Sequence, residues 1–279
     1  MKALQRLQQR YAAGEARALY ELIMEQRFGL SRTDILLGKD TTLSVKDKAE
    51  LQNIIDRVVE GEPVQYVLGS EEFCGRTFLV GPGVLIPRPE TQQLVRLVVQ
   101  NVASGSSVLD VGTGSGCIAI TLALTGYKVT ALDISEEALS YARKNTERLG
   151  AEVEFLKEDI QTLSNSFSSK GRRWEAIVSN PPYICESEAK TMEENVLMHE
   201  PHLALFVPDD DPLLFYRAIV EYGRKHLNEK GWLFFEINRA YPEQVKELLL
   251  QKGYDDVKIV KDEYDNNRFV FGRLGNYEL

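Results

Sequence analysis

The chain has few cysteines, and they follow no pattern. Its 279 residues include only Cys74, Cys117 and Cys185, which are far apart and odd in number. This spacing supports neither a disulfide framework nor a paired-cysteine metal site. We therefore expect a reduced protein in the cytoplasm.

Long apolar runs are also missing. Residues 1–6 lead into a polar, charged segment without the apolar centre of a signal peptide. No uninterrupted apolar stretch approaches the roughly 20 residues that a membrane-spanning helix needs. The sequence predicts no membrane association.

Positive charge is scarce. Lysine and arginine number 33 against 42 acidic residues, so the formal net charge is −9. A domain that binds nucleic acid through its phosphates is usually basic, and direct nucleic-acid binding is therefore not expected. An acidic enzyme can still meet a basic partner, including a ribosome-associated factor. The nucleophile turn G-x-S-x-G and the Walker loop are absent too.

What the sequence does contain is a regular alternation of strands and helices after residue 106. Helices are expected at 117–124 and 213–226, and another begins after Ser135 and stops at Gly150. Such alternation predicts an α/β fold with a largely parallel sheet covered by helices on both faces. Strands are expected at 107–111, 128–133, 153–155, 174–179, 232–237, 257–261 and 268–272.

The region before this alternation divides into two parts. Residues 1–62 carry apolar side chains at helical spacing and predict a small helical domain. Residues 63–85 are β-like and interrupted by glycines, which predicts a β-hairpin linker. The remaining domain, 86–279, includes a long acidic loop over 184–212, and such loops are often functional.

A glycine-rich turn follows the first expected strand, in Asp110-Val111-Gly112-Thr113-Gly114-Ser115-Gly116. The glycines permit a tight turn and a close approach of the backbone to a ligand. Their spacing differs by one residue from the dinucleotide pattern G-x-G-x-x-G. Alone, the turn is a weak signal.

Acidic residues follow the next two strands. Asp133 comes 21 residues after Gly112, where a carboxylate can accept hydrogen bonds from both hydroxyls of a ribose. Asp159 can accept from an adenine amino group, while Ile160 packs on the ring. Each aspartate has an alternative role as an ordinary turn or strand-end acid. Together with the glycine turn, however, they predict a nucleoside pocket.

The tetrapeptide Asn180-Pro181-Pro182-Tyr183 ends the strand at 174–179. The prolines fix φ and remove two N–H donors, which makes a rigid strand end with free acceptors. The Asn180 side-chain oxygen and the Pro181 carbonyl can each accept one hydrogen of a target NH2 group, and Tyr183 can stack on a planar target. Beside a nucleoside pocket, this predicts methyl transfer from S-adenosylmethionine (AdoMet) to an amide or amine nitrogen. The alternative is a structural Pro-Pro turn.

Two histidines, His199 and His202, flank Glu200-Pro201. No further side chain joins them at metal-ligand spacing, so we expect loop or packing residues and no metal site.

With these motifs the chain resembles the HemK/PrmC family of protein-(glutamine-N5) methyltransferases, which modify peptide chain release factors. The resemblance implies a seven-stranded, Rossmann-like class I AdoMet-dependent methyltransferase domain behind a helical domain that recognises the release factor. The acceptor would be the glutamine of a Gly-Gly-Gln motif. The resemblance rests on Pro63-Val64-Gln65-Tyr66, Glu72-Phe73-x-Gly75-Arg76, Ile86-Pro87-Arg88-Pro89-Glu90-Thr91, the glycine turn, the Asn180 tetrapeptide and Glu200-Pro201-x-x-Ala204-Leu205.

The resemblance also assigns roles to residues. Asn180, Pro181, Pro182 and Tyr183 would hold the glutamine. The chain departs from the family at Gln92, where glutamate is usual, and at Asn238, where glycine is usual. AdoMet would contact Gly112, Thr113, Gly114, Ser115, Gly116, Asp133, Asp159, Ile160 and Asn180.

Three other functions fit parts of the pattern. A nucleic-acid amino-methyltransferase, acting on adenine N6 or guanine N2, would share the Asn-Pro-Pro-Tyr motif but would need a basic surface. An NAD-dependent oxidoreductase conflicts with the glycine spacing and with the Asn-Pro-Pro-Tyr motif. A catalytically silent protein that only binds release factors conflicts with the intact Asn180 and Asp133.

Overall fold

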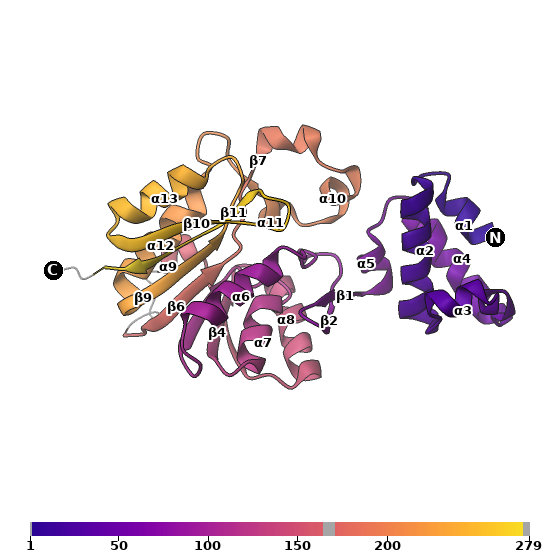
Figure 1. The fold of residues 1–279 in the computed structure, drawn as a ribbon, viewed down its shortest axis with the longest axis horizontal. Coiled ribbons are helices and arrows are strands. Elements are labelled where there is room, and N and C mark those ends of the chain that lie inside the picture. Colours follow the sequence, from indigo (N-terminus) through magenta and orange to yellow (C-terminus); the bar gives the residue numbers. More distant parts are fainter. Residues whose placement is uncertain (1, 164–170, 276–279) are drawn as a thin grey trace. The chain divides into compact units, whose positions relative to one another are not determined.

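The computed structural model describes residues 2–163 and 171–275, which form two compact units (Figure 1). The first unit comprises residues up to Ser70 together with 80–82 and 192–199, and the second comprises the rest. The segment 63–85 is thus divided between the two units.

The first unit is a bundle of helices, as expected from its apolar spacing. Helix α4 begins where the Ser44 hydroxyl accepts from the Asp47 N–H, and its apolar stripe buries Leu51, Ile55 and Val58. Before Ser70 the described helices of this unit are α1 (Lys2–Leu7), α2 (Ala13–Phe28), α3 (Arg32–Leu36), α4 (Val45–Val59) and α5 (Val64–Leu68), with a 3-10 turn, η1 (Lys39–Thr42). The segment 192–199 adds α10 (Glu194–His199).

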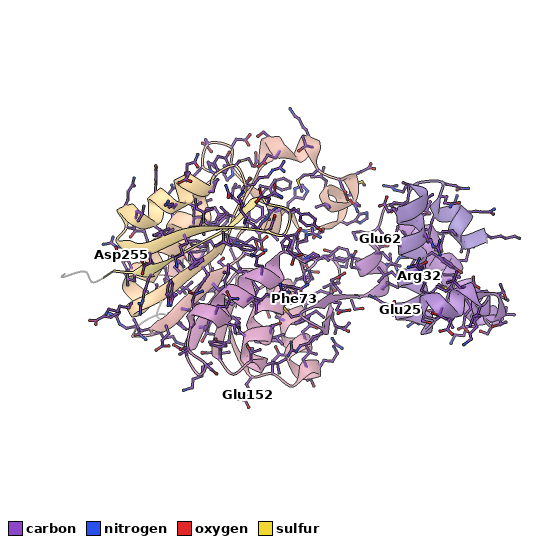
Figure 2. All side chains as sticks on the ribbon, in the orientation of Figure 1. Glu25, Arg32, Glu62, Phe73, Glu152 and Asp255 are labelled. Carbon is purple, nitrogen blue, oxygen red and sulfur yellow. The ribbon has the colours of Figure 1, made fainter. Side chains whose placement is uncertain are left out.

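The β-like interpretation of residues 63–69 is wrong, because Val64–Leu68 forms helix α5. Pro63 precedes the first turn, where its missing N–H costs nothing, and Gly69 ends the helix at φ 76°. The hairpin is confined to β1 (Ser70–Phe73) and β2 (Arg76–Leu79). Its Phe73 and Phe78 rings are buried edge to face, 6.0 Å apart, in the core of the second unit. Phe73 is labelled in Figure 2.

The second unit is built on a seven-stranded sheet with the order β10-β11-β9-β6-β3-β4-β5. Neighbouring strands are parallel from β9 to β5, whereas β11 runs antiparallel to both β9 and β10. This confirms the predicted, largely parallel α/β sheet. The strands are β3 (Ser107–Val111), β4 (Lys128–Asp133), β5 (Val153–Lys157), β6 (Trp174–Ser179), β9 (Leu227–Glu236), β10 (Tyr254–Lys261) and β11 (Asn267–Leu274).

Helices cover both faces of this sheet. Successive strand residues point to opposite faces, so Val108 packs with α6 and α7 while Leu109 packs with α12 and α13. Within the described ranges, no helix is both long and apolar enough to cross a bilayer. The helices are α6 (Thr91–Asn101), α7 (Cys117–Leu124), α8 (Glu136–Leu149), α9 (Ile160–Leu163), α12 (Leu214–His226) and α13 (Pro242–Gln251).

The segment 184–212, expected to be a loop, contains several short elements. Its two-residue strands β7 (Ile184–Cys185) and β8 (Phe206–Val207) pair in parallel. Between them lie η3 (Glu186–Thr191), α10 (Glu194–His199) and α11 (His202–Leu205). Elements of two to six residues are too short to show a hydrophobic period, which is why the sequence pattern does not reveal them.

Candidate active site

The carboxyl ends of four neighbouring strands meet at one edge of the sheet. Strand β3 pairs in parallel with β4 and β6, and β4 pairs in parallel with β5. One cavity lies at this edge, as expected for an open α/β sheet. Its lining includes the predicted residues Gly112, Thr113, Gly114, Ser115, Asp133, Asp159, Ile160, Asn180, Pro181 and Pro182.

The three glycines of the turn after β3 have different surroundings. All adopt positive φ, with values of 73° at Gly112, 55° at Gly114 and 81° at Gly116. A Cβ at Gly112 would meet no atom within 4 Å, whereas one at Gly116 would lie 2.9 Å from Ile120 and 3.2 Å from Ala142. The first glycine therefore leaves backbone open to the cavity. Gly116 lets helices pack closely and is not in the cavity lining.

Asp133 joins the turn to the end of β4. Its Oδ2 accepts a hydrogen bond from the Gly114 N–H at 2.9 Å, and its Oδ1 accepts from the Ser135 N–H at 2.9 Å. Burial raises the pKa of this carboxyl, while the backbone donors oppose the shift. A carboxylate has about four acceptor positions, so it can also accept from two ligand hydroxyls. Asp133 is thus a turn residue that retains binding capacity.

Asp159 follows β5 and has a similar local role. Its Oδ1 accepts from the Gln161 N–H at 2.9 Å, and the neighbouring Ile160 is buried at the start of α9. Both residues line the cavity. An acidic acceptor beside an apolar side chain can receive an aromatic ring that carries an amino group.

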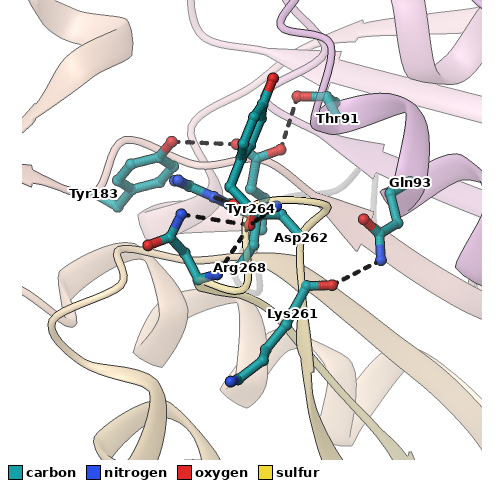
Figure 3. A network of polar contacts seen from close by, with 9 residues as sticks. Thr91, Gln93, Tyr183, Lys261, Asp262, Tyr264 and Arg268 are labelled. Carbon is teal, nitrogen blue, oxygen red and sulfur yellow. Dashed lines mark hydrogen bonds and ion pairs between the residues drawn. The ribbon is translucent and has the colours of Figure 1, made fainter.

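Asn180 is held by a chain of side-chain hydrogen bonds. Its Nδ2 donates to Thr91 Oγ1 at 3.2 Å, and the Thr91 hydroxyl donates to Glu236 Oε2 at 2.7 Å. The Tyr183 hydroxyl donates to the other oxygen, Glu236 Oε1, at 3.2 Å. Figure 3 shows the bonds from Thr91 and Tyr183 to the Glu236 carboxylate, beside the Arg268–Asp262 ion pair, whose nitrogen and oxygen are 3.2 Å apart. One buried carboxylate is therefore connected to both ends of the tetrapeptide.

Burial raises the pKa of both titratable side chains of this network, Glu236 and Tyr183. It raises the pKa of Glu236, although the Thr91 hydroxyl and the charge of Arg268 oppose the shift. Burial, with the nearby charge of Glu236, also raises the pKa of Tyr183, so its hydroxyl stays neutral and can donate. Tyr183 is not among the residues that line the cavity, so its stacking on a target remains a prediction.

A second buried carboxylate secures the proline-rich segment before α6. Glu200, which is 3% exposed, accepts from the Ile86 N–H at 3.1 Å and from Arg88 Nη2 at 2.6 Å. This ties residues 86–91 to the start of α11. His202 packs against Phe206 with ring centroids 5.2 Å apart. The part of the chain that the structure describes contains no group of three or more acidic, histidine or cysteine side chains that could hold a metal.

Asn238 contacts the tetrapeptide from the end of β9. Its Nδ2 donates to the Tyr183 carbonyl at 3.0 Å and to Glu188 Oε2 at 2.9 Å, and its Oδ1 accepts from the Ala240 N–H at 2.9 Å. At this departure from the family pattern, a side chain makes three contacts that glycine would lack.

The sequence alone assigns no role to Thr91, Glu200 or Glu236. Thr91 and Glu200 lie in segments on which the family resemblance rests, and Glu236 lies two positions before the departure at Asn238. The partners of their side chains are 53 to 145 positions away in the sequence, as in Tyr183–Glu236 and Thr91–Glu236. No local pattern shows such pairs.

Known proteins with similar sequences agree with this architecture. A model of the PrmC N-terminal domain matches residues 1–69, and a methyltransferase-domain model matches residues 103–207. A release factor glutamine methyltransferase of Bacteroides thetaiotaomicron is 49% identical over 268 residues, which cover 95% of each chain. Another, of Flavobacterium psychrophilum, is 38% identical and covers 92% of this chain and 91% of its own.

Solved structures show the same fold. A methyltransferase from Pyrococcus furiosus has a TM-score of 0.54 and 21% identity, covering 80% of this chain and 99% of its own. A 16S rRNA methyltransferase of T. thermophilus, solved with AdoMet and guanosine, has a TM-score of 0.52 and 19% identity. The match covers 74% of this chain and 55% of that protein. These two support the class I methyltransferase fold alone. On the identity and coverage of its sequence relatives, the chain belongs to the release factor glutamine methyltransferase family.

Proposed function

We propose that this chain transfers the methyl group of AdoMet to the side-chain N5 nitrogen of the glutamine in the Gly-Gly-Gln motif of peptide chain release factors. The observation that carries the proposal is the orientation of Asn180. Its NH2 group is engaged by Thr91, which leaves its oxygen to accept from a target, and the residue lines the cavity together with Pro181. The Asn180 oxygen and the Pro181 carbonyl suit a primary amide, because each can accept one hydrogen of its NH2 group.

The residues of the cavity fit AdoMet. The open backbone at Gly112 allows close contact with the ligand, and the Asp133 carboxylate suits two ribose hydroxyls. Asp159 and Ile160 suit the adenine amino group and ring. When bound, AdoMet supplies an electrophilic methyl group on a sulfonium.

The work left to the protein is mainly orientation. An amide nitrogen is a poor nucleophile because its lone pair is delocalised into the carbonyl. Accepting both NH2 hydrogens, at Asn180 Oδ1 and the Pro181 carbonyl, favours a pyramidal nitrogen and aims its lone pair. Each hydrogen bond contributes about 0.5–1.5 kcal/mol net. Orientation for attack can contribute roughly 7–11 kcal/mol, so no strong base is required.

We also propose that the first unit selects the release factor. Every residue given a cofactor role lies in the second unit, whereas the first has no glycine turn or strand-end acid. A single glutamine side chain offers too few contacts to identify its carrier protein, so a second surface is needed.

Labelled AdoMet tests the proposed substrate class directly. The full-length protein is incubated with purified release factor, with tRNA and rRNA, and with DNA in parallel. We expect label on the release factor alone, and Asn180→Ala should reduce the single-turnover rate about a hundredfold because the amide is misoriented. Efficient label on nucleic acid, with none on protein, would instead support an amino-methyltransferase acting on bases.

A further inference from the structure

We propose that Glu236 is a positioning residue that determines which arm of the Asn180 amide faces the substrate, acting through the Thr91 hydroxyl. This inference rests on the proposed function, because it concerns how the target NH2 is recognised. It assigns a task to a buried acid that does not itself line the cavity.

The hydrogen bonds of Thr91 have a fixed direction. A threonine hydroxyl has one proton and can donate only once. Thr91 is 2.7 Å from Glu236 Oε2 and 3.2 Å from Asn180 Nδ2. The Thr91 hydroxyl donates its proton to Glu236 Oε2, and an ionised carboxylate at that place can only accept. Toward Asn180, therefore, Thr91 can only accept.

The direction of the Thr91 bond fixes the orientation of the Asn180 side chain. Its amide carries an oxygen on one arm and an NH2 group on the other. Because Thr91 accepts, the NH2 arm must face Thr91, and the oxygen arm is left for a ligand. The reversed amide would present NH2 to the NH2 of a glutamine, and neither group can accept. Recognition of the substrate by Asn180 thus depends on the charge state of Glu236, which is two hydrogen bonds away.

Glu236 also binds Tyr183, at the other end of the tetrapeptide. Its hydroxyl donates to Glu236 Oε1 at 3.2 Å, so the two oxygens of this acid serve two different hydroxyl donors. Glu236 is only 2% exposed, and water cannot easily replace either bond. Charged groups around it include Arg268, which opposes its neutralisation, and Glu90, which favours it.

Glu236, Thr91 and Asn180 form a hydrogen-bonded relay, and two nearly isosteric changes break it at different points. Glu236→Gln puts an NH2 group in place of one oxygen, so one of the two hydroxyls must accept instead of donating. If that hydroxyl is Thr91, its proton turns to Asn180 and the amide reverses. Thr91→Val keeps the shape and removes the hydroxyl, whereas Thr91→Ser keeps the hydroxyl and removes a methyl group.

The test compares these three variants with the wild type, using full-length protein and intact release factor. Turnover, KM for the release factor, AdoMet affinity by calorimetry and thermal stability are measured for each. Thr125→Val is the control, since this threonine just after α7 is exposed and its hydroxyl donates to the Leu122 carbonyl at 2.9 Å, outside the network. Binding is also measured for a release factor whose acceptor glutamine is replaced by glutamate.

We expect Thr91→Val and Glu236→Gln to lower kcat by about tenfold to a hundredfold, with AdoMet affinity within about threefold of wild type. Thr91→Ser should recover most of the rate that Thr91→Val loses. Glu236→Gln should also reduce the preference for glutamine over glutamate in the release factor, because a reversed Asn180 amide donates to a carboxylate. A role in stability alone would not change that preference.

Equal rates for Thr91→Val and Thr91→Ser would overturn the relay, as would a Glu236→Gln protein that keeps both the turnover and the glutamine preference of the wild type. Because each variant removes a different part of the relay, one that fails to fold leaves the other as a valid test. A wild-type protein that binds AdoMet but leaves the release factor unmethylated would reject the proposed function instead.

Discussion

Asn238 donates a hydrogen bond to the main-chain oxygen of Tyr183 across 3.0 Å, which joins the end of β9 to the tetrapeptide after β6. The same nitrogen donates to Glu188, in the segment that follows the tetrapeptide. At this position, where the family resemblance implies glycine, this chain thus has a side chain that restrains the backbone of the tetrapeptide.

Replacing Asn238 with alanine should loosen this restraint. The two donated bonds contribute about 1–2 kcal/mol in total, and we expect that loss in the free energy of unfolding. Turnover should fall a few-fold while AdoMet affinity is kept, because Asn238 is not in the cavity lining. Denaturant titration and steady-state kinetics measure the two effects. An unchanged stability would show that the contacts contribute nothing.

Asp133→Ala should weaken AdoMet binding and leave the fold intact. Loss of a charged acceptor for two hydroxyls costs on the order of 1.5–3 kcal/mol of binding free energy. Isothermal calorimetry measures the change, and Asp209→Ala, which removes an exposed acid elsewhere, is the matched control. If both variants bind AdoMet as the wild type does, Asp133 is only a turn residue.

Asp110 should make stability depend on pH. Burial raises its pKa to about 7, and Asp110 Oδ1 has no hydrogen-bond partner among the described residues. An unfolded aspartate titrates near about 3.9, so between these values the folded state binds more protons. Asp110 therefore stabilises the folded state most at low pH. Its contribution to the free energy of unfolding falls by roughly 4 kcal/mol as the pH rises to about 7.

Asp110→Asn removes this dependence. Its melting temperature should exceed that of the wild type at pH 8, and the difference should shrink as the pH falls toward 4. Calorimetric scans of both proteins across that range give the comparison. A difference that does not vary with pH would mean that Asp110 titrates normally in the folded protein.

The first unit exposes an apolar pair that suits a role in selecting the partner. Leu36 and Leu37 are 70% and 72% exposed. The double change to serine should raise KM for intact release factor about tenfold, equivalent to roughly 1.4 kcal/mol, without altering AdoMet affinity. Leu250→Ser, at a 49% exposed position of the second unit, is the control. Equal KM values for the two variants would place selection elsewhere.

The strands of the sheet could be predicted because they are buried apolar runs between turn signals. Ser107–Val111 and Trp174–Ser179 have the predicted limits, and so does helix Cys117–Leu124. The prediction for residues 63–69 failed because β-branched Val64 and Val67 resemble a strand locally, whereas Pro63 and Gly69 delimit a short helix. Propensity over five residues is too weak to decide between the two.

The candidate site could be predicted where a single segment contains both the functional side chain and the strand end that positions it. Asn180 follows one strand and Asp133 ends another, and parallel pairing brings strand ends together. The orientation of Asn180 was not predictable, because it depends on Thr91 and Glu236, which are 145 positions apart. Only the folded chain brings those two side chains together.

Mass spectrometry of a release factor after incubation with this protein and AdoMet is the most direct test of the proposed methylation. We predict one added methyl group, located by peptide fragmentation on the glutamine of the Gly-Gly-Gln motif and absent when that glutamine is replaced by alanine. Methylation at any other residue, or an unmodified release factor alongside methylated nucleic acid, would contradict the account.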